Sequence, residues 1–451
     1  MLIKNNHHKI VRIEIKKLFG RFNYNIDLSS EENFIKIITA PNGYGKSTIL
    51  KIVEAFVQNN FLFFVHTDFQ EIKFFISNSS KPIVFKKTKS NYYIDEINIT
   101  YLSHQSLLDG NFFDAITNLE NFLPIYRTGE NQWKSFDSEN IILTLPDVIR
   151  KFKGHTSIFE LTRNFDWLIE ITQQIQVLYI STNRLINFSH VQDHREVTDY
   201  EKNSLTIFGL QNSIQELIQK SLRIQFNENR KKEASFPERL LKQLDKSQNS
   251  NRAPKIFKLL TKIGEYEKNF QSLGILSNIT LNPNSVSSLI SHIRDNAGAK
   301  VLEVYLTDIV ERLAKLEPLA NKISLFKKNL NDLLSFKCIK ISPEIGFEIY
   351  PINNQRKTES ISLDELSSGE QHLILLIGEL IFNINSDTLV LIDEPEISLH
   401  PAWQEEFINI LRKIQGINSF SVVIATHAPA LINGNWDSVL ELSEQYWNDN
   451  K

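Results

Sequence analysis

The sequence predicts an α/β fold whose sheet-and-helix core is interrupted by a long helical insertion. Residues 34–39 read as a buried strand that runs into a glycine-rich loop, and helical spacing resumes at Ile49. Apolar strands at residues 388–392 and 421–425 each end in polar side chains. Between these regions, residues 205–335 are helical in pattern and laced with charge. We therefore expect the α/β core, here called the head, to consist of an N-terminal part at residues 1–200 and a C-terminal part at residues 336–451. The helical insertion between them covers residues 201–335.

Composition limits the class of protein. Lys and Arg (50) nearly balance Asp and Glu (53), so the net charge of -3 gives no whole-molecule attraction to nucleic acid or anionic membrane. The single cysteine, Cys338, excludes an internal disulfide and a multi-cysteine zinc site, which fits a reducing compartment. No stretch reaches the roughly 18 apolar residues of a membrane span, and residues 1–10 lack the apolar region of a signal peptide. We expect a cytoplasmic protein without a membrane partner.

Further strands and a helix are expected around these elements. Residues 59–100 combine short apolar alternations with polar breaks, which is typical of a small antiparallel sheet. A polar turn and an apolar helix are expected over residues 363–380. Further strands are expected at residues 11–15, 177–180, 338–341 and 347–350.

The glycine-rich loop at residues 40–47, the P-loop, has the chemistry of a phosphate-binding site. Backbone N–H groups at a helix N-terminus converge on anionic oxygens, and glycines permit the close approach. Lys46 would reach the β and γ phosphates of ATP, and Ser47 would place its hydroxyl on Mg²⁺. The alternative for such a loop, taken alone, is a structural glycine turn. The candidate nucleotide-binding residues are Asn42, Gly43, Gly45, Lys46, Ser47 and Thr48.

One position departs from the written pattern G-x-x-x-x-G-K-[ST]. Ala40 stands where the pattern has its first glycine. Alanine is tolerated there if the backbone does not need a positive φ at that point.

Two carboxylates follow the apolar strand at residues 389–392. Asp393 would hold Mg²⁺ through its water shell, beside Ser47. Glu394 would polarise the water that attacks the γ-phosphate, a catalytic role that needs an ionisable oxygen beside the substrate. The alternative is that these acids only cap a helix, as acidic residues after strands often do.

Two further segments carry polar groups of the right kind. The segment at residues 366–371, here called the signature segment, opens an apolar helix with serine hydroxyls and free N–H groups. Taken alone it reads as a helix cap. His427 ends the strand at residues 422–426 and could contact a γ-phosphate as donor or acceptor, although a lone histidine is more often structural. The candidates are Ser367, Ser368, Gly369, Glu370 and Gln371 for nucleotide contact and His427 for catalysis.

The four elements occur in an order that chance explains poorly, and this order and spacing resemble those of ABC-type ATPases. Residues 18–22, 41–47 and 393–404 are similar to SMC, RecF and OLD-type ATPases, and Ser368 and His400 differ from the usual transporter sequence. The likeness covers residues 11–48 and 362–432. It implies an ABC-type head with ATP and Mg²⁺ as cofactors. It also implies a head-to-tail homodimer or higher homo-oligomer, in which the signature segment of one chain completes the ATP site of another.

The same resemblance suggests two loops and a partner. Residues 398–400 would lie in the D-loop, and the turn at residues 181–184 is the candidate glutamine loop. Relatives often work with a nuclease, and about two dozen residues follow His427, so we expect any nuclease to be a separate chain. The arrangement resembles the ATPase subunits of the two-gene anti-phage systems PARIS and Septu, by length more the former. The expected function is therefore an ATP-hydrolysing sensor that holds and releases an effector, with a phage trigger protein as a further partner.

Two other functions stay open. Residues 220–268 hold thirteen basic and six acidic residues, so this stretch could bind DNA in a repair or DNA-organising ATPase, or could be an ordinary solvated helix surface. In the third hypothesis, bound ATP is a structural clamp without turnover. The apolar spacing over residues 306–334 fits a coiled-coil seam or an amphipathic helix packed on its own domain, because Pro318 interrupts the run.

Overall fold

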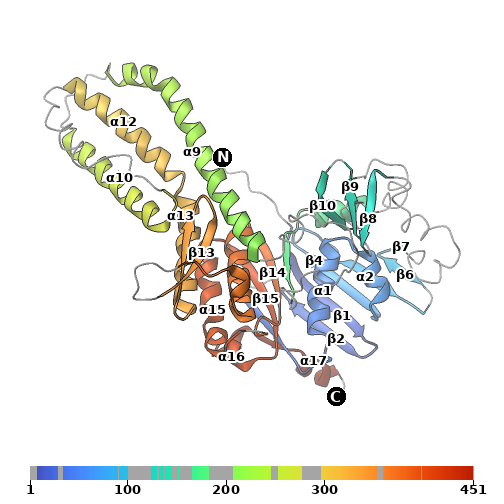
Figure 1. Cartoon of the computed structure of the whole chain (residues 1–451). Coiled ribbons are helices and arrows are strands. Elements are labelled where there is room, and N and C mark those ends of the chain that lie inside the picture. Colours follow the sequence, from blue (N-terminus) through green and yellow to red (C-terminus); the bar gives the residue numbers. More distant parts are fainter. Residues whose placement is uncertain are drawn as a thin grey trace. The chain divides into compact units, whose positions relative to one another are not determined.

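The computed structural model confirms an α/β fold with a helical insertion (Figure 1). Its contacts divide the chain into two compact units, residues 1–202 with 384–451 and residues 203–383. The sequence suggested that the head resumes at residue 336, whereas residues 336–383 make their contacts with the inserted helices. The structure describes residues 8–28, 34–89, 91–99, 123–129, 132–136, 138–144, 148, 151, 165–181, 207–244, 252–276, 296–352, 359–397 and 399–449.

A parallel five-stranded sheet forms the centre of the first unit. Its strand order is β11-β14-β15-β3-β16, and every neighbouring pair runs parallel. The carboxyl ends of parallel strands meet at one edge of a sheet, which is where ligands bind in such folds. The helix α1 (Lys46–Val57) packs on this sheet. The strands are β3 (Ile35–Thr39), β11 (Val177–Ile180), β14 (Thr388–Asp393), β15 (Phe420–Thr426) and β16 (Val439–Glu441).

A six-stranded antiparallel sheet lies in the same unit and shares its core with α1. The strand order is β2-β1-β4-β5-β6-β7, which confirms the antiparallel region expected after residue 59. Phe56 of α1 stacks on Phe74 of this sheet, with ring centroids 3.9 Å apart. The strands are β1 (Ile10–Leu18), β2 (Phe22–Asp27), β4 (Glu71–Ile76), β5 (Ile83–Lys87), β6 (Tyr92–Ile94) and β7 (Ile97–Asn98).

Smaller elements complete the first unit. A three-stranded sheet has the order β10-β9-β8. Its strands are β8 (Ile125–Gly129), β9 (Gln132–Ser135) and β10 (Ser138–Thr144). The remaining helices are α2 (Phe61–His66), α7 (Asp166–Thr172), α15 (Pro401–Gln415), α16 (Pro429–Ile432), a 3-10 turn (Trp436–Ser438) and α17 (Leu442–Asp449).

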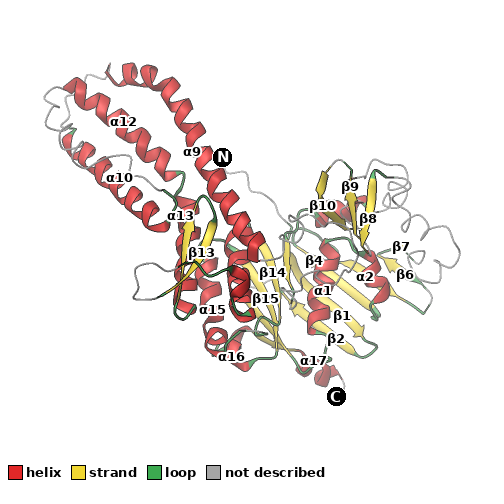
Figure 2. Cartoon of the chain, in the orientation of Figure 1, coloured by secondary structure: helices red, strands yellow, loops and turns green. Residues whose placement is uncertain are grey.

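The second unit is built on four long helices, drawn red in Figure 2. The helix α12 (Asn296–Ala314) contacts both α9 (Ile207–Leu244) and α10 (Ala253–Leu273), and α13 (Glu317–Leu333) follows it. The apolar residues of the expected seam are buried here, as an amphipathic packing of these helices requires. They are Leu306, Ile309, Leu313, Leu316, Ala320, Ile323, Leu330 and Leu334.

Prolines act differently at three places in these helices. Pro318 lies at the start of α13 and Pro254 at the start of α10, where the missing N–H costs nothing. Pro237 lies inside α9, which continues on both sides of it. The carbonyl of Lys232, in the preceding turn, accepts hydrogen bonds from the side chains of Ser235 and Arg239.

A β-hairpin and the signature helix complete the second unit. The hairpin pairs β12 (Lys337–Ser342) with β13 (Gly346–Pro351), and its turn lies so close to α9 that a side chain at Gly346 would meet the backbone of Gln211. Side-chain amides of α9 donate to three carbonyls of the hairpin. A 3-10 turn (Leu363–Glu365), α14 (Ser368–Gly378) and a π-helical turn (Glu379–Asn383) follow.

Candidate nucleotide site

The P-loop connects β3 to α1 and bends through two left-handed glycines. Gly43 has a φ of 89° and Gly45 a φ of 86°, a conformation that side chains other than glycine's rarely adopt. Gly45 is the N-cap residue of α1. Because glycine has no side chain, it makes no capping hydrogen bond to the first N–H groups of the helix. A Cβ at Gly45 would lie 3.0 Å from Leu18 and 3.1 Å from Phe19. The turn between β1 and β2, which carried part of the resemblance, therefore packs directly on this glycine.

Alanine is compatible with the position where the pattern has glycine. Ala40 is buried and does not have a positive φ, so the condition that the sequence left open is met. Lys46 is also buried, and its Nζ donates to the carbonyl of Ala40 over 2.8 Å. Asn42 and Gly43 are exposed in the loop, and Thr48 is half-buried in the first turn of α1.

The two predicted metal ligands lie in contact. The hydroxyl of Ser47 donates to Oδ1 of Asp393 over 2.8 Å, although 346 positions separate them in the chain. Tyr179, near the end of β11, donates to the other oxygen, Oδ2, over 3.2 Å. A hydroxyl and a buried carboxylate are oxygen ligands of the kind that Mg²⁺ prefers. Among the described residues there is no group of three acidic, His or Cys side chains that could hold a metal. The pair thus fits Mg²⁺ that keeps waters and phosphate oxygens as its other ligands.

Glu394 follows Asp393 in a strained backbone conformation. Its φ is 44°, which is uncommon for a residue with a side chain, and its N–H donates to the carbonyl of Ala425 on β15 over 2.8 Å. The chain then turns, because the N–H of Ile397 donates to the carbonyl of Glu394. Glu394 therefore lies at the start of a turn rather than within the buried strand. The side chain of Glu394 is 23% exposed.

His427 lies beside two carboxylates. Its Nδ1 is 3.1 Å from Oε1 of Glu396 and 3.7 Å from Oε1 of Glu394, so both carboxylates lie within ion-pair distance of the ring and Glu396 is the nearer. The backbone N–H of His427 donates to the same oxygen of Glu396 over 3.0 Å. The imidazole is 51% exposed, whereas the carboxylate of Glu396 is 5% exposed. The structure therefore brings together the two catalytic candidates, Glu394 and His427, and adds Glu396.

The segment after these carboxylates is fixed by its own side chains. His400 caps α15, where its Nδ1 accepts from the N–H of Ala402 over 3.3 Å, and Pro401 takes the first position of the helix. Gln404 reaches back and donates to the carbonyl of Leu399 over 3.0 Å. Much of the sequence at residues 399–404 is thereby accounted for by helix initiation. Ser398 lies outside the described residues.

The signature segment forms a capping box at the start of α14. The hydroxyl of Ser367 accepts from the N–H of Glu370, and the carboxylate of Glu370 accepts from the N–H of Ser367 over 2.9 Å. The other oxygen of Glu370 pairs with Lys337 at 2.5 Å. Gln371 donates hydrogen bonds to the carbonyls of Leu363 and Leu366, each with a donor–acceptor distance of 3.1 Å.

These contacts leave the signature residues with different capacities. The carboxylate of Glu370 and the amide nitrogen of Gln371 are engaged within the second unit, so nucleotide contact by either side chain stays a prediction. Burial raises the pKa of Glu370, but the hydrogen bonds from Lys337 and Ser367 outweigh burial and hold that pKa below its ordinary value. Ser368 and Gly369 stand at the N-terminus of α14, where the helix has backbone N–H groups to offer.

Sequence reasoning missed three residues of these sites and left one loop undecided. These residues are Tyr179, which contacts Asp393, Lys337, which contacts Glu370, and Glu396, which contacts His427. Each belongs to a sequence pattern that also fits an ordinary strand or turn. Glu396 was visible only within the resembling segment. Of the candidate glutamine loop, Ser181 is described, and residues 182–184 lie outside the described part.

Helices long and apolar enough to span a membrane do not occur in the described part of the chain.

Part of the chain is similar to a known protein family. Residues 217–433, just under half of the chain, match the family described as "AAA domain, putative AbiEii toxin, Type IV TA system". A 67-residue stretch is 33% identical to Protein ea59 of Escherichia phage lambda, and the match spans 15% of this chain and 13% of that protein.

Solved structures of Smc head domains also align with the chain. The head with an extended coiled coil from Pyrococcus furiosus, bound to the C-terminal domain of ScpA, matches at 11% identity and a TM-score of 0.36, over 96% of this chain and 93% of that one. The head with a coiled coil and joint from Pyrococcus yayanosii matches at 13% identity and a TM-score of 0.32, over 98% and 100%. The part of the chain that matches the AAA family model includes the signature segment, Asp393, Glu394 and His427.

Proposed function

We propose that the chain is an ATP-binding and ATP-hydrolysing subunit of an anti-phage defence system, which holds and releases a separate effector protein of nuclease type. In this proposal two copies associate head to tail, and the signature segment of one copy completes the ATP site of the other. ATP and Mg²⁺ are the cofactors. The protein works in the cytoplasm and responds to a phage trigger protein.

The contact between Ser47 and Asp393 carries the nucleotide part of the proposal. Two residues that the metal chemistry needs on one ion lie 2.8 Å apart at the carboxyl edge of a parallel sheet. Lys46 starts the helix that follows the glycine loop, so its amine and the helix N-terminus can act on the same phosphates. This arrangement supports binding of a magnesium nucleotide more than a structural turn, because a turn needs neither the lysine nor the buried carboxylate.

Glu394 and His427 support hydrolysis at this site. Glu394 is partly exposed at the end of β14, where it can polarise a water molecule for attack on the γ-phosphate. His427 presents an exposed imidazole at the end of β15. The strands β14 and β15 are parallel neighbours, so their carboxyl ends lie side by side. When Mg²⁺ is bound, it neutralises charge on the phosphate oxygens. The residues of this chain orient the water and hold the phosphates.

The defence part of the proposal rests on weaker support. The matched family is described as a putative AbiEii toxin of a type IV toxin–antitoxin system, and the partial relative belongs to a phage. The toxin–antitoxin description and the phage relative are the support for a defence role. The effector is inferred from the resemblance to two-gene systems.

Three variants test the ATPase. Lys46→Ala removes the phosphate-binding amine, and we expect it to abolish ATP binding and turnover. Glu394→Gln keeps the shape of the side chain but removes the base, so turnover should fall by about 10²–10⁴-fold while ATP still binds. Lys51→Ala, at an exposed lysine of the same helix, is the matched control and should keep both. Undiminished turnover in Glu394→Gln would remove Glu394 as the base.

Light scattering and plaque assays test the other parts. If ATP sites are shared between copies, Glu394→Gln should shift from monomer to dimer when ATP is added, and Lys46→Ala should not. If the protein defends its host, cells that carry it with its genomic neighbours should resist phage, and the Lys46→Ala variant should lose that resistance. Resistance that survives Lys46→Ala would contradict the proposal.

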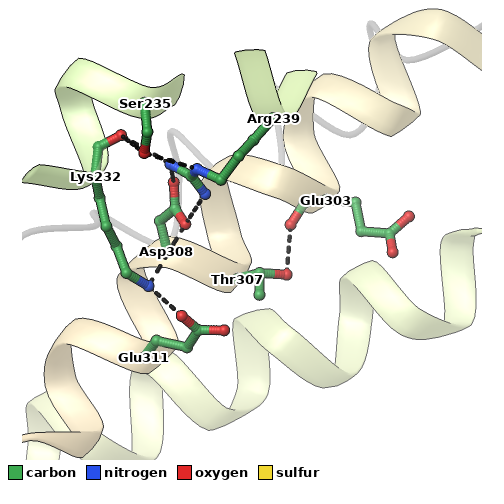
Figure 3. Close-up of polar contacts among 7 residues, drawn as sticks. All are labelled: Lys232, Ser235, Arg239, Glu303, Thr307, Asp308 and Glu311. Atoms are coloured by element: carbon green, nitrogen blue, oxygen red, sulfur yellow. Dashed lines mark hydrogen bonds and ion pairs between the residues drawn. The ribbon is translucent and has the colours of Figure 1, made fainter. Parts of the chain in front are cut away.

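Direct binding of DNA is less well supported, because acidic residues of α12 compensate the basic stretch (Figure 3). Arg239 pairs with Asp308 through both guanidinium nitrogens, at 2.5 and 2.8 Å, and Lys232 contacts Asp308 and Glu311. Further along, Arg252 and Lys255 both pair with Glu303, which is almost fully buried. Four of the thirteen basic residues thus already contact carboxylates that lie outside the stretch.

A salt titration decides between these functions. A DNA-organising ATPase would bind duplex DNA by itself, with an affinity that falls steeply as salt rises. We expect no such binding by the isolated protein at 50 mM salt in the presence of ATP. Salt-dependent binding that Lys220→Glu or Lys268→Glu reduces would favour the DNA function instead.

A further inference from the structure

Glu396 is a buried carboxylate that none of the assigned roles uses. It lies in the turn after β14, and its side chain is 5% exposed. One oxygen, Oε1, accepts from the backbone N–H of His427 at 3.0 Å and lies 3.1 Å from Nδ1 of the same residue. A single oxygen therefore holds both the backbone and the ring of His427.

The position of the ring nitrogen between two carboxylates limits its protonation. A carboxylate oxygen 3.1 Å from Nδ1 attracts that nitrogen only when it carries a proton, so the position of Glu396 favours the proton on Nδ1 of His427. The other nitrogen, Nε2, is then left for groups on the exposed side of the ring. Glu394 lies 3.7 Å from the same Nδ1, and it would become the next acceptor if Glu396 were missing.

The second oxygen of Glu396 makes this arrangement costly. Oε2 is buried, and no described residue donates a hydrogen bond to it. A buried polar atom without a partner destabilises the folded state, so a side chain kept only for stability would be better replaced by a smaller or neutral one. Sites that sacrifice stability in this way are expected where function needs them.

We propose that Glu396 is a positioning residue for ATP hydrolysis. It fixes the orientation of the His427 ring and keeps the proton on Nδ1, and by occupying that nitrogen it leaves the carboxylate of Glu394 available to the attacking water. This inference rests on the proposed ATPase function and assigns a residue outside its motifs.

Steady-state kinetics tests the role with four variants and a control. We expect Glu396→Ala to lower kcat about tenfold to a hundredfold, the scale on which outer-sphere partners of functional histidines act, with KM for ATP within about twofold of wild type. Glu396→Gln keeps an oxygen that can accept from the backbone N–H of His427 and face its ring, so it should restore kcat to within about threefold. The double variant Glu396→Ala with His427→Ala should be no slower than His427→Ala alone, because both changes remove one function. Glu405→Gln, at an exposed carboxylate of α15, is the control for loss of charge.

Two outcomes would overturn the inference. A kcat for Glu396→Ala equal to that of the Glu405→Gln control would show that the ring needs no anchor. A further loss in the double variant, multiplying the two single losses, would show that Glu396 acts independently of His427. Thermal unfolding separates a structural role: Glu396→Gln keeps the accepting oxygen and exchanges one unpartnered buried atom for another, so its Tm should stay close to that of wild type, whereas a fall of Tm in step with kcat would assign Glu396 a structural role.

A readout without turnover separates this inference from the function on which it rests. In ¹⁵N-edited NMR of the histidine rings, the His427→Ala variant identifies the signal of His427. We expect a protonated Nδ1 in wild type and a changed signal in Glu396→Ala. If wild type hydrolyses no ATP, the ATPase proposal fails, and the NMR result still decides whether Glu396 holds the ring. An unchanged signal in Glu396→Ala would overturn the anchor itself.

Discussion

The two left-handed glycines of the P-loop should respond differently to alanine. Gly45→Ala and Gly43→Ala impose the same backbone penalty, because both residues have a φ near +90°. Only at position 45 does the new Cβ meet neighbours, at 3.0 Å from Leu18 and 3.1 Å from Phe19, and nothing lies within 4 Å at position 43. Gly434 offers a third comparison, with a φ of 80° and open space, outside the P-loop.

The geometry gives the size of the effect. An L-residue in the left-handed conformation costs about 1–2 kcal/mol, and this is the whole penalty expected for Gly43→Ala and Gly434→Ala. Crowding in a packed region adds about 1–3 kcal/mol, so Gly45→Ala should destabilise the fold by about 2–5 kcal/mol. At about 2–4 °C per kcal/mol, Tm should fall roughly twice as far for Gly45→Ala as for the other two.

Thermal unfolding followed by circular dichroism, with and without ATP and Mg²⁺, measures both stability and ligand response. A ligand at about a hundred times its Kd stabilises by about 2.7 kcal/mol, so wild type and Gly434→Ala should show a clear rise in Tm. Gly43→Ala should lose most of that rise at the same nucleotide concentration, because the loop cannot take its shape without strain. Equal losses of Tm in Gly43→Ala and Gly45→Ala would refute the crowding argument. A lost ATP response in Gly434→Ala would refute the assignment of the loop.

Two further predictions concern contacts that lie beside the motifs. A lowered pKa for Glu370 contributes stability above its ordinary value of 4.5 that is lost as pH falls below it. Lys337→Met should therefore flatten the fall of Tm between about pH 5 and 3, and parallel curves for wild type and variant would contradict this. Tyr179→Phe removes a hydrogen bond to Asp393, worth about 0.5–1.5 kcal/mol, so half-maximal turnover should need roughly twofold to tenfold more Mg²⁺. An unchanged Mg²⁺ requirement would mean that the Tyr179 hydroxyl does not orient Asp393 for the metal.

The local elements of the fold could be predicted because their signals are local. The strand expected at residues 34–39 is β3 at 35–39, and that at 388–392 is β14 at 388–393. Continuous apolar runs that end in glycine or paired carboxylates need no knowledge of the rest of the chain. The juxtaposition of Ser47 and Asp393 was also expected, because both residues were assigned to the same Mg²⁺.

Other contacts could not be predicted because they depend on exact backbone geometry. Glu396 contacts His427 from a turn in which Glu394 adopts a left-handed conformation, and no pattern around residue 394 signals that conformation. The basic stretch was overestimated in the same way, since Asp308 lies about seventy residues from Arg239 in sequence and contacts it directly. Pro237 and Pro318 look alike in sequence, yet one lies within a helix and the other begins one.

The order of strands in the parallel sheet has a consequence for synthesis of the protein. The P-loop strand β3 pairs only with β15 and β16 among the described strands, and its partner residues lie about 390 positions later in the chain. At roughly 5–20 residues per second, the ribosome needs tens of seconds to deliver them. During that interval β3 lacks the partner strands β15 and β16, and the P-loop that follows it is not held against a completed sheet. Nucleotide binding can therefore begin only after residues 420–441 have emerged, so nascent chains stalled before this point should be unable to bind ATP.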